Sequence, residues 1–137
     1  AGLIRAEGGA ALLIDYGRDT HGPGDTLQAL SRHRKVDPLA TPGQADLTQW
    51  ADFPAVLEEA RLAGVATAPL LTQAEFLTRL GLTVRADRLK TAQPDSADIL
   101  GRQVARLISP DQMGTLFKVA ALHAPETLTL PAFEVAA

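Results

Sequence analysis

The sequence predicts an α/β fold, and three observations support this assignment. Residues 10–14 form a continuous apolar run bounded by glycines, which is typical of a strand buried on both faces of a parallel sheet. Residues 53–63 carry apolar side chains at helical spacing, which predicts an amphipathic helix. Strand-like and helix-like segments then alternate as far as residue 122, and this alternation is the pattern of α/β domains.

Composition excludes several classes of protein. The 137 residues suffice for one domain, and 46% of them are hydrophobic, enough for a core. A net charge of −3 creates no field that would attract nucleic acid or an anionic membrane. Cysteine is absent, which excludes disulfides and thiolate nucleophiles. No apolar run approaches the roughly 20 residues of a membrane-spanning helix. We therefore expect no nucleic-acid partner and no membrane insertion.

The first half of the chain predicts one strand followed by a long irregular stretch. Residues 1–9 are a lead-in, and the strand covers 10–16. Three glycines and one proline in 17–25 predict a loop, either an ordinary surface connection or a lid over a pocket. Residues 26–37 are ambiguous, and their β-favouring side chains indicate an extended segment. Prolines then predict a second loop that runs to Thr48.

The middle of the chain carries the clearest local signals. The helix at 53–63 has a proline in its first turn, where the missing N–H costs little, and a glycine directly after its end. Val65 to Leu71 is a short strand candidate. Thr72 and Glu75 have the spacing of a capping box, which predicts the start of a second helix.

The last third of the chain predicts helices and one further strand. Residues 82–93 favour a helical turn or two, and apolar residues at helical spacing predict a helix over 96–108. Residues 115–122 predict a strand in which Lys118 is the only charge. Three good strands are few for an α/β sheet, so we expect the missing strands to lie upstream.

The candidate site follows the first strand, because ligands of α/β sheets bind beyond the carboxyl ends of the strands. Asp15, Tyr16 and Gly17 occupy that position. Asp15 either orients a cationic ligand or accepts backbone N–H groups of the following loop, and both interpretations remain open. We expect Tyr16, the only tyrosine, to place its hydroxyl at the edge of a pocket.

Further polar residues lie in or beside the two loops, and they either line a substrate pocket or form a solvated rim: Asp15, His21, Asp25, His33, Asp37 and Asp46. A neutral His33 beside an acid would serve as a general base. The histidines lack the i, i+4 spacing of a helical zinc site, and we expect no metal. The basic run 32–35 is interpreted as a solvated strand face. Glycine-rich nucleotide loops and the G-x-S-x-G elbow are absent from the sequence.

Several stretches, taken in order, resemble one family. They include Gly9-Ala-Ala-Leu-Leu-Ile-Asp-Tyr-Gly17, Asp37-Pro-Leu-Ala-Thr-Pro-Gly-Gln-Ala-Asp-Leu-Thr48 and Met113-Gly-Thr-Leu-Phe-Lys-Val119. This ordered set is similar to the C-terminal part of the MidA-like S-adenosylmethionine-dependent methyltransferases. That family includes a mitochondrial assembly factor that methylates an arginine of a respiratory NADH dehydrogenase subunit. The resemblance covers nearly all of residues 9–120.

The resemblance implies the C-terminal part of a Rossmann-like methyltransferase sheet, with helices on both faces and a late antiparallel strand at 115–122. The glycine-rich loop that holds S-adenosylmethionine belongs to the N-terminal half of this family. We therefore expect residues 1–137 to be a single domain that forms the C-terminal portion of a longer enzyme. No cofactor-binding residue is assigned, and the 137 residues alone should bind the cofactor poorly.

The resemblance also implies a protein-arginine substrate, for which a subunit of respiratory NADH dehydrogenase is the candidate. In that frame Asp15 and His33 are the catalytic residues. Substrate binding falls to a second set: Tyr16, Gly17, Asp37 and Asp46. Carboxylates hold a guanidinium by bidentate hydrogen bonds. The expected location is the bacterial cytoplasm or the mitochondrial matrix. Two alternatives remain open, namely a non-catalytic scaffold that binds proteins and a methyltransferase of small molecules.

Overall fold

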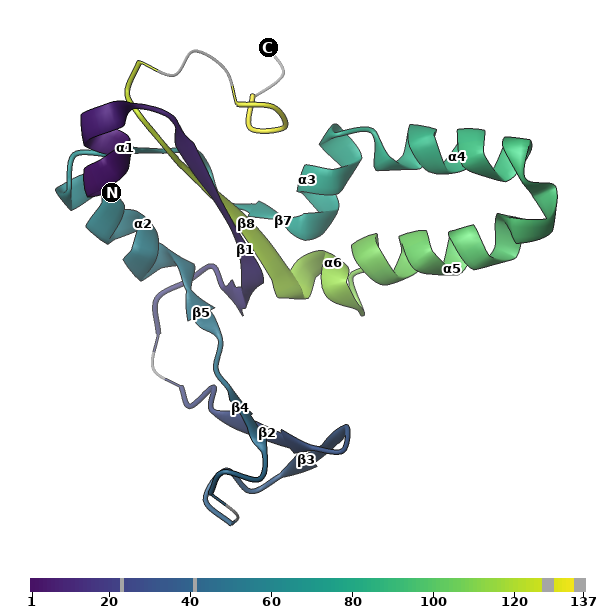
Figure 1. Ribbon diagram of the computed structural model, residues 1–137, viewed down its shortest axis with the longest axis horizontal. Coiled ribbons are helices and arrows are strands. Elements are labelled where there is room, and N and C mark those ends of the chain that lie inside the picture. The colour runs from purple at the N-terminus through teal and green to yellow at the C-terminus, as the bar shows by residue number, and fades with distance from the viewer. Residues whose placement is uncertain (23, 41, 127–129, 135–137) are drawn as a thin grey trace.

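The computed structural model describes residues 1–22, 24–40, 42–126 and 130–134. Figure 1 shows a sheet with helices beside it, a pair of helices that extends to one side, and a small separate sheet below. The elements follow in this order: α1 Gly2–Glu7, β1 Ala10–Arg18, β2 Gln28–Ser31, β3 Arg34–Val36, β4 Asp46–Thr48, β5 Ala51–Asp52, α2 Phe53–Leu62, β6 Ala66–Thr67, β7 Leu71–Thr72, α3 Gln73–Arg79, α4 Leu82–Ala92, a 3₁₀ turn Pro94–Ser96, α5 Ala97–Ile108, α6 Met113–Leu116 and β8 Phe117–His123.

The main sheet has five strands, and β8 lies at its centre. Its order is β5-β1-β8-β6, with β7 also pairing with β8. Strand β8 runs antiparallel to β1 from Ala10↔His123 to Tyr16↔Phe117. The parallel pairing of β1 with β5 is confined to Gly17 and Arg18. The predicted late antiparallel strand is therefore confirmed, and this strand joins the first part of the chain to the last.

Helices cover both faces of the sheet, as the sequence predicts. Successive side chains of β8 point to opposite faces. Ala120 and Leu122 share one hydrophobic cluster with residues of α2. Val119 and Ala121 share the other cluster with Phe76 of α3 and with Phe133 near the C-terminus. Five consecutive residues of β8 are buried as a result.

The prediction that residues 10–16 are buried on both faces is wrong, although they do form a strand. Leu12 is 48% exposed, Leu13 is 36% exposed and Ile14 is 48% exposed. Over residues 10–16, β1 has a paired neighbour, β8, along one edge, and among the described residues no strand pairs with the other edge. An apolar run predicts that a segment forms a strand. Whether that strand is buried depends on the elements that pack around it.

Residues 26–37 are extended, as expected, but they belong to a separate sheet. Strands β2, β3 and β4 pair antiparallel in the order β3-β2-β4. This three-stranded sheet projects away from the main sheet (Figure 1). We call residues 27–48 the arm. The second predicted loop thus contains a strand, β4, and the lead-in at residues 1–9 contains helix α1.

Local sequence signals fix the starts of α2 and α3. Asp52 precedes α2, and its side chain accepts a hydrogen bond from the N–H of Ala55 at 3.2 Å. Thr72 and Glu75 form the predicted capping box at the start of α3, with both reciprocal hydrogen bonds present. Each bond satisfies an N–H group that the first helical turn leaves unpaired.

The remaining predictions hold in part. Residues 82–92 form the complete helix α4, which packs beside α5, and residues 65–71 contribute to two short strands instead of one. The strand predicted at 115–122 begins later, at Phe117, because residues 113–116 form a helical turn. Gly114 permits this turn, since a Cβ atom there would collide with the backbone of Ile108.

Candidate functional site

The candidate site is built at the carboxyl end of β1. Asp15 is exposed, and its Oδ1 accepts a hydrogen bond from the N–H of Tyr16 at 2.8 Å. The Tyr16 ring packs edge-on against Phe117 of β8, with the ring centroids 5.7 Å apart. This contact fixes the ring, while the other oxygen of the Asp15 carboxylate has no protein partner among the described hydrogen bonds.

Gly17 is buried because the backbone of β5 and the start of α2 approach it closely. A Cβ atom at this position would lie 2.9 Å from the ring of Phe53 and would collide with the carbonyl oxygen of Ala51. Only glycine leaves room for the pairing of β1 with β5. The observed requirement at Gly17 is therefore one of packing, and its assignment to substrate binding stays a prediction.

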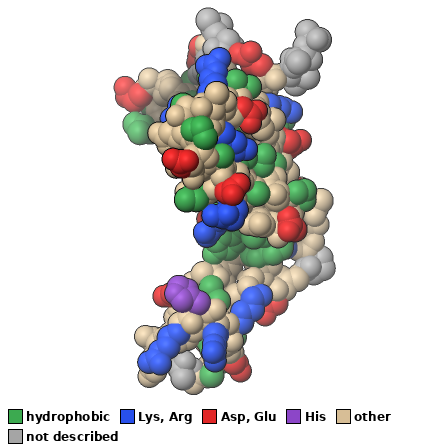
Figure 2. Space-filling view, turned by 90° about the vertical axis from the view of Figure 1, so that its right-hand side faces the viewer, with side chains coloured by type: hydrophobic (Ala, Val, Ile, Leu, Met, Phe, Trp, Pro, Cys, Tyr) green, Lys and Arg blue, Asp and Glu red, His purple; other side chains and the backbone are tan. Residues whose placement is uncertain are grey.

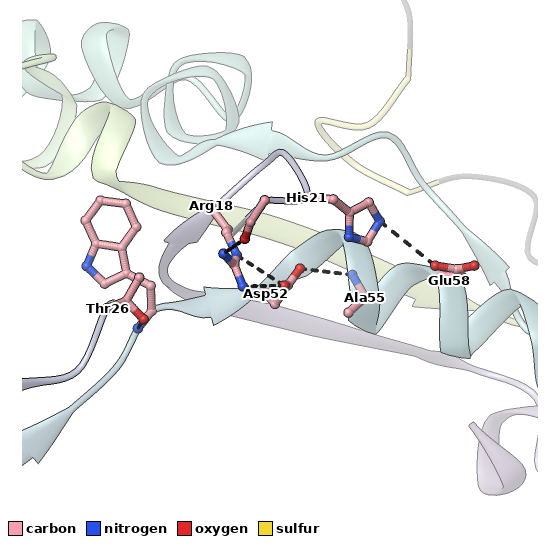
Figure 3. A network of polar contacts seen from close by, with 8 residues as sticks. Arg18, His21, Thr26, Asp52, Ala55 and Glu58 are labelled. Carbon is pink, nitrogen blue, oxygen red and sulfur yellow. Dashed lines mark hydrogen bonds and ion pairs between the residues drawn. The ribbon is translucent and has the colours of Figure 1, made fainter. Parts of the chain in front are cut away.

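An ion pair fastens the end of β1 to the start of α2. Arg18 donates to Oδ2 of Asp52 from Nη2 at 2.7 Å and from Nε at 3.1 Å, and it also donates to the carbonyl of Gly22 (Figure 3). The N–H of Ala55 is the main cause that lowers the pKa of Asp52, and Arg18 lowers the pKa further. Asp52 therefore stays ionised, so the ion pair and the helix cap support each other.

Lys118 holds the loop after β1 from the opposite side. It is 8% exposed, and its Nζ donates to the carbonyl of Thr115 at 2.7 Å and pairs with Asp19 at 3.2 Å. Lys118 stands directly opposite Asp15 in the sheet. A lysine so far from water needs such partners, because an unpaired buried charge is costly. Together with Arg18, Lys118 determines where the chain leaves the sheet.

A polar groove of about 380 Å³ lies between this loop and α2. It is lined by Asp19 and His21 from the loop, by Glu58 and Arg61 from α2, and by the segment 68–70. His21 Nε2 lies 3.9 Å from a carboxylate oxygen of Glu58, and Figure 3 shows both side chains on the same side of the helix. The groove offers both signs of charge to a ligand at the carboxyl end of β1.

The structure divides the predicted site residues into two groups. Asp15, Tyr16 and Gly17 lie together at the end of β1, whereas three others lie on the arm: His33, Asp37 and Asp46. Asp37 accepts a hydrogen bond from the N–H of Leu39 at 2.8 Å, and Asp46 stands opposite Leu30 in β4. The two groups belong to separate sheets, so the structure does not bring His33 beside Asp15 (Figure 1).

Sequence analysis missed four residues that organise this end of the sheet: Arg18, Asp19, Asp52 and Lys118. Two of them left a signal. Asp52 precedes a Phe-Pro pair at a helix start, which is where a capping acid is expected. Lys118 is the only charge in an apolar strand, which indicates a paired partner. Asp52, the partner of Arg18, lies 34 positions away in the chain, and nothing in the sequence indicates that these two residues meet.

The glycines at the two ends of β1 do not form a cofactor cradle. The space beside Gly17 is filled by Phe53, and Gly8 and Gly9 lie at the opposite end of β1. Within residues 1–22, 24–40, 42–126 and 130–134, no three His, Asp or Glu side chains gather to hold a metal ion. None of the helices in these ranges has the length and apolar character needed to cross a membrane.

The fold and the site place the chain in a class. Its mixed sheet superimposes on a Burkholderia thailandensis protein of the COG1565 superfamily with a TM-score of 0.83 and 33% identity, over 93% of this chain and 36% of that one. A second superfamily member from the same organism, bound to S-adenosyl-homocysteine, gives a TM-score of 0.78 and 32% identity over 90% and 34%. The class is therefore that of Rossmann-like methyltransferases.

The sequence specifies the family. Residues 2–70 match the family described as "Putative S-adenosyl-L-methionine-dependent methyltransferase", and the chain belongs to this family. It is 37% identical over 121 residues to the Drosophila melanogaster "Protein arginine methyltransferase NDUFAF7 homolog, mitochondrial". This alignment covers 87% of this chain and 28% of the relative. The Rattus norvegicus "Protein arginine methyltransferase NDUFAF7, mitochondrial" is also 37% identical, over 87% and 27%. The chain thus spans about a quarter of the curated relatives that it matches.

Proposed function

We propose that this chain is the C-terminal portion of an S-adenosylmethionine-dependent methyltransferase that methylates an arginine of a protein. The observation that carries the proposal is the 37% identity, over 87% of the chain, with relatives named as protein arginine methyltransferases. The structural neighbour bound to S-adenosyl-homocysteine supports the choice of cofactor. The loop that holds the cofactor would lie in the part of the enzyme upstream of this chain.

The open edge of β1 supports this place in a longer enzyme. Leu12, Leu13 and Ile14 expose apolar surface beside an edge that no described strand pairs over residues 10–16. Long apolar edge strands invite aggregation, and proteins normally cover them. An upstream strand of the same enzyme would pair with this edge and would extend the sheet toward the cofactor.

In this enzyme the cofactor supplies an electrophilic methyl group, and the residues of this chain position the acceptor. The exposed carboxylate of Asp15 would accept hydrogen bonds from a substrate guanidinium and balance its charge. The ring of Tyr16 lies on the other face of β1, fixed against Phe117, and would hold the strand that carries Asp15 in place. Holding the acceptor in line with the methyl group accounts for much of the rate of such transfers.

We extend the proposal to the substrate and the location. A subunit of respiratory NADH dehydrogenase is the acceptor that the family resemblance implies, and the relatives above are named as mitochondrial. The enzyme would therefore work in the mitochondrial matrix or, in a bacterium, in the cytoplasm.

The test uses the full-length enzyme, purified NADH dehydrogenase subunits and S-adenosylmethionine with an isotopically labelled methyl group. Mass spectrometry should find the label on an arginine. Asp15→Asn should lower kcat/KM on the order of ten- to a hundred-fold, because a charge-assisted hydrogen bond is lost. Asp98→Asn, an exposed carboxylate change on α5, is the matched control and should leave turnover unchanged.

Each alternative function has its own result in this test. A protein-binding scaffold would bind no S-adenosylmethionine in calorimetry and would leave every acceptor unlabelled. A methyltransferase of small molecules would bind the cofactor but would transfer the label to no protein arginine. If Asp15→Asn left turnover unchanged, Asp15 would not belong to the site, but the proposed class of enzyme would be unaffected.

A further inference from the structure

The tip of the arm carries the longest run of consecutive basic residues in the sequence. Arg32, His33, Arg34 and Lys35 follow one another, and all four side chains are exposed. Among the ion pairs of the described residues none involves these four. Figure 2 shows several Lys and Arg side chains and a histidine on the projecting part at the bottom of the view. In a chain of net charge −3, these cations lie apart from the main sheet.

The backbone of the turn is strained at two of these basic residues. Arg32 has a φ of 49° and His33 a φ of 63°, both in the left-handed region. Two-residue turns of this kind strongly favour Asn-Gly, because other residues pay a steric cost there. A non-glycine residue held in this region costs about 1 kcal/mol or more. The arm therefore gives up stability to present two basic side chains at its tip.

Apolar side chains flank the basic tip on the same small sheet. Leu30 pairs with Lys35 across β2 and β3, so both side chains project from one face. Asp46 also stands opposite Leu30 and shares this face, whereas Leu47, opposite Ala29, projects from the other face. Leu30 is 37% exposed, Leu47 is 60% exposed and Leu39 is 82% exposed. A surface that combines free cations with exposed leucines suits an acidic peptide segment that also carries apolar residues. Nucleic acid would gain little from the leucines, and the net negative charge of the chain would repel it.

The base of the arm is fixed at the candidate site. The chain enters the arm from the loop that Arg18 and Lys118 hold, and it returns through β5, where Asp52 pairs with Arg18. The N–H of Trp50 donates to Oγ1 of Thr26 at 3.2 Å, which joins the entering and returning segments (Figure 3). A partner bound to the arm would therefore extend from the carboxyl end of β1, where the acceptor arginine is placed.

We propose that the basic tip of the arm, residues 32–35, docks an acidic segment of the protein substrate. This inference rests on the proposed function for the identity of the partner, and it adds a second recognition site outside the site of methyl transfer. The arm would lower the KM for substrates that carry acidic residues near the acceptor arginine. The rate of the bound complex would not change, because these residues do not touch the reacting atoms.

The experiment uses the full-length enzyme and two synthetic fluorescent peptides. Both carry one arginine, flanked in one peptide by runs of Glu and Leu and in the other by Gln and Leu. Fluorescence anisotropy should show tighter binding of the Glu peptide, on the order of ten-fold at low salt, since each exposed ion pair adds a few-fold. The difference should shrink in about 0.5 M salt, where charges are screened. The variant Arg32→Gln/Arg34→Gln/Lys35→Gln should abolish it.

Two further variants make the result interpretable. Arg85→Gln/Arg88→Gln/Arg102→Gln removes three exposed cations from the hairpin of α4 and α5 and should bind like the wild type. Arg32→Asn/His33→Gly supplies the residues that the left-handed turn favours, so it should weaken binding of the Glu peptide while the arm folds at least as well. In turnover, the variant Arg32→Gln/Arg34→Gln/Lys35→Gln, which keeps His33, should raise the KM for the Glu peptide and leave kcat unchanged.

The outcomes separate this proposal from the proposed function. If neither peptide is methylated but the arm variants still lose selective binding, the arginine methyltransferase assignment fails and the docking surface stands. Equal binding of the Glu peptide by the wild type and the arm variants overturns the docking surface. Equally tight, arm-dependent binding of a single-stranded RNA of the same charge also overturns it, because the arm would then be a general anion site.

Discussion

Strands β1 and β8 have similar apolar sequences, yet the sheet buries one and exposes the other. Val119 and Ala120 of β8 are completely buried, whereas Leu12 and Ile14 of β1 are each 48% exposed. Strand β8 has paired strands on both edges and helices on both faces. Strand β1 has β8 along one edge and a two-residue contact with β5 along the other. The burial of a strand therefore depends on the elements that pack around it. Its own apolar residues permit burial but do not cause it.

The largest expected effect lies in β8. Val119→Asp in the full-length enzyme should lower the free energy of unfolding by about 4 kcal/mol or more, because a charge would enter a site without water or partners. Chemical denaturation followed by circular dichroism measures this change. Val84→Asp, at a position 56% exposed on α4, is the control and should change stability by about 0.5 kcal/mol or less. Equal effects of the two variants would contradict the central position of β8.

The second effect tests whether β1 stays exposed in the longer enzyme. Leu12→Asp should cost about 2 to 4 kcal/mol there if the upstream part of the enzyme covers this face of β1, and we expect that result. Leu39→Asp, on the arm and 82% exposed, should cost far less. If Leu12→Asp changes the denaturation midpoint no more than Leu39→Asp, then this face of β1 is open in the whole protein, and the proposed place of the chain is wrong.

The third effect concerns the point where β1 meets β5. Gly17→Ala should destabilise the enzyme by about 2 kcal/mol, since the added methyl group meets the Phe53 ring and the Ala51 carbonyl. Gly101→Ala in α5 is the matched change, because nothing lies within 4 Å of its Cβ position. It should stabilise the helix by about 0.5 to 1 kcal/mol. Thermal unfolding of both variants, measured side by side, decides between a packing glycine and a tolerant position.

The smallest effect is a dependence on pH beside β8. The N–H and hydroxyl groups of Thr72 lower the pKa of Glu75 below its reference value of 4.5, and Lys118 adds to this shift. A lowered pKa in the folded state stabilises the fold fully above pH 4.5, and the contribution is lost as the pH falls through the lowered pKa. Glu75→Gln should therefore reduce the acid-induced fall in unfolding free energy between pH 5 and pH 3. An unchanged slope would contradict this role.

Local features of this fold could be predicted from the sequence, and distant ones could not. The capping box at Thr72 and Glu75 and the proline in the first turn of α2 depend on neighbouring residues, and both predictions are confirmed. The burial of β1 and the Arg18–Asp52 ion pair depend on elements far away in the chain. The left-handed turn at Arg32 and His33 lacks the Asn-Gly pair that usually marks a hairpin, so the arm gave no local signal.

The same distinction applies to the candidate site. The sequence predicts Asp15, Tyr16 and Gly17 at the end of a strand, and all three lie within the last part of β1. The side chains of Asp15 and Tyr16 therefore point to opposite faces of the sheet. Grouping His33 with Asp15 assumed that polar residues of successive loops meet. The three-stranded sheet carries His33 away from β1. The pairing of β2 with β3, for example Leu30 with Lys35, and of β2 with β4, for example Leu30 with Asp46, decides this.

The pairing of β1 with β8 has a consequence for how the protein forms. Ala10 pairs with His123 and Tyr16 with Phe117, so the partners are roughly a hundred residues apart. Contacts of such long sequence separation require the closure of a large loop and slow the folding reaction. On the ribosome, the apolar segment of β1 would emerge long before its partner. This segment therefore stays without its partner strand until roughly a hundred further residues have been synthesised.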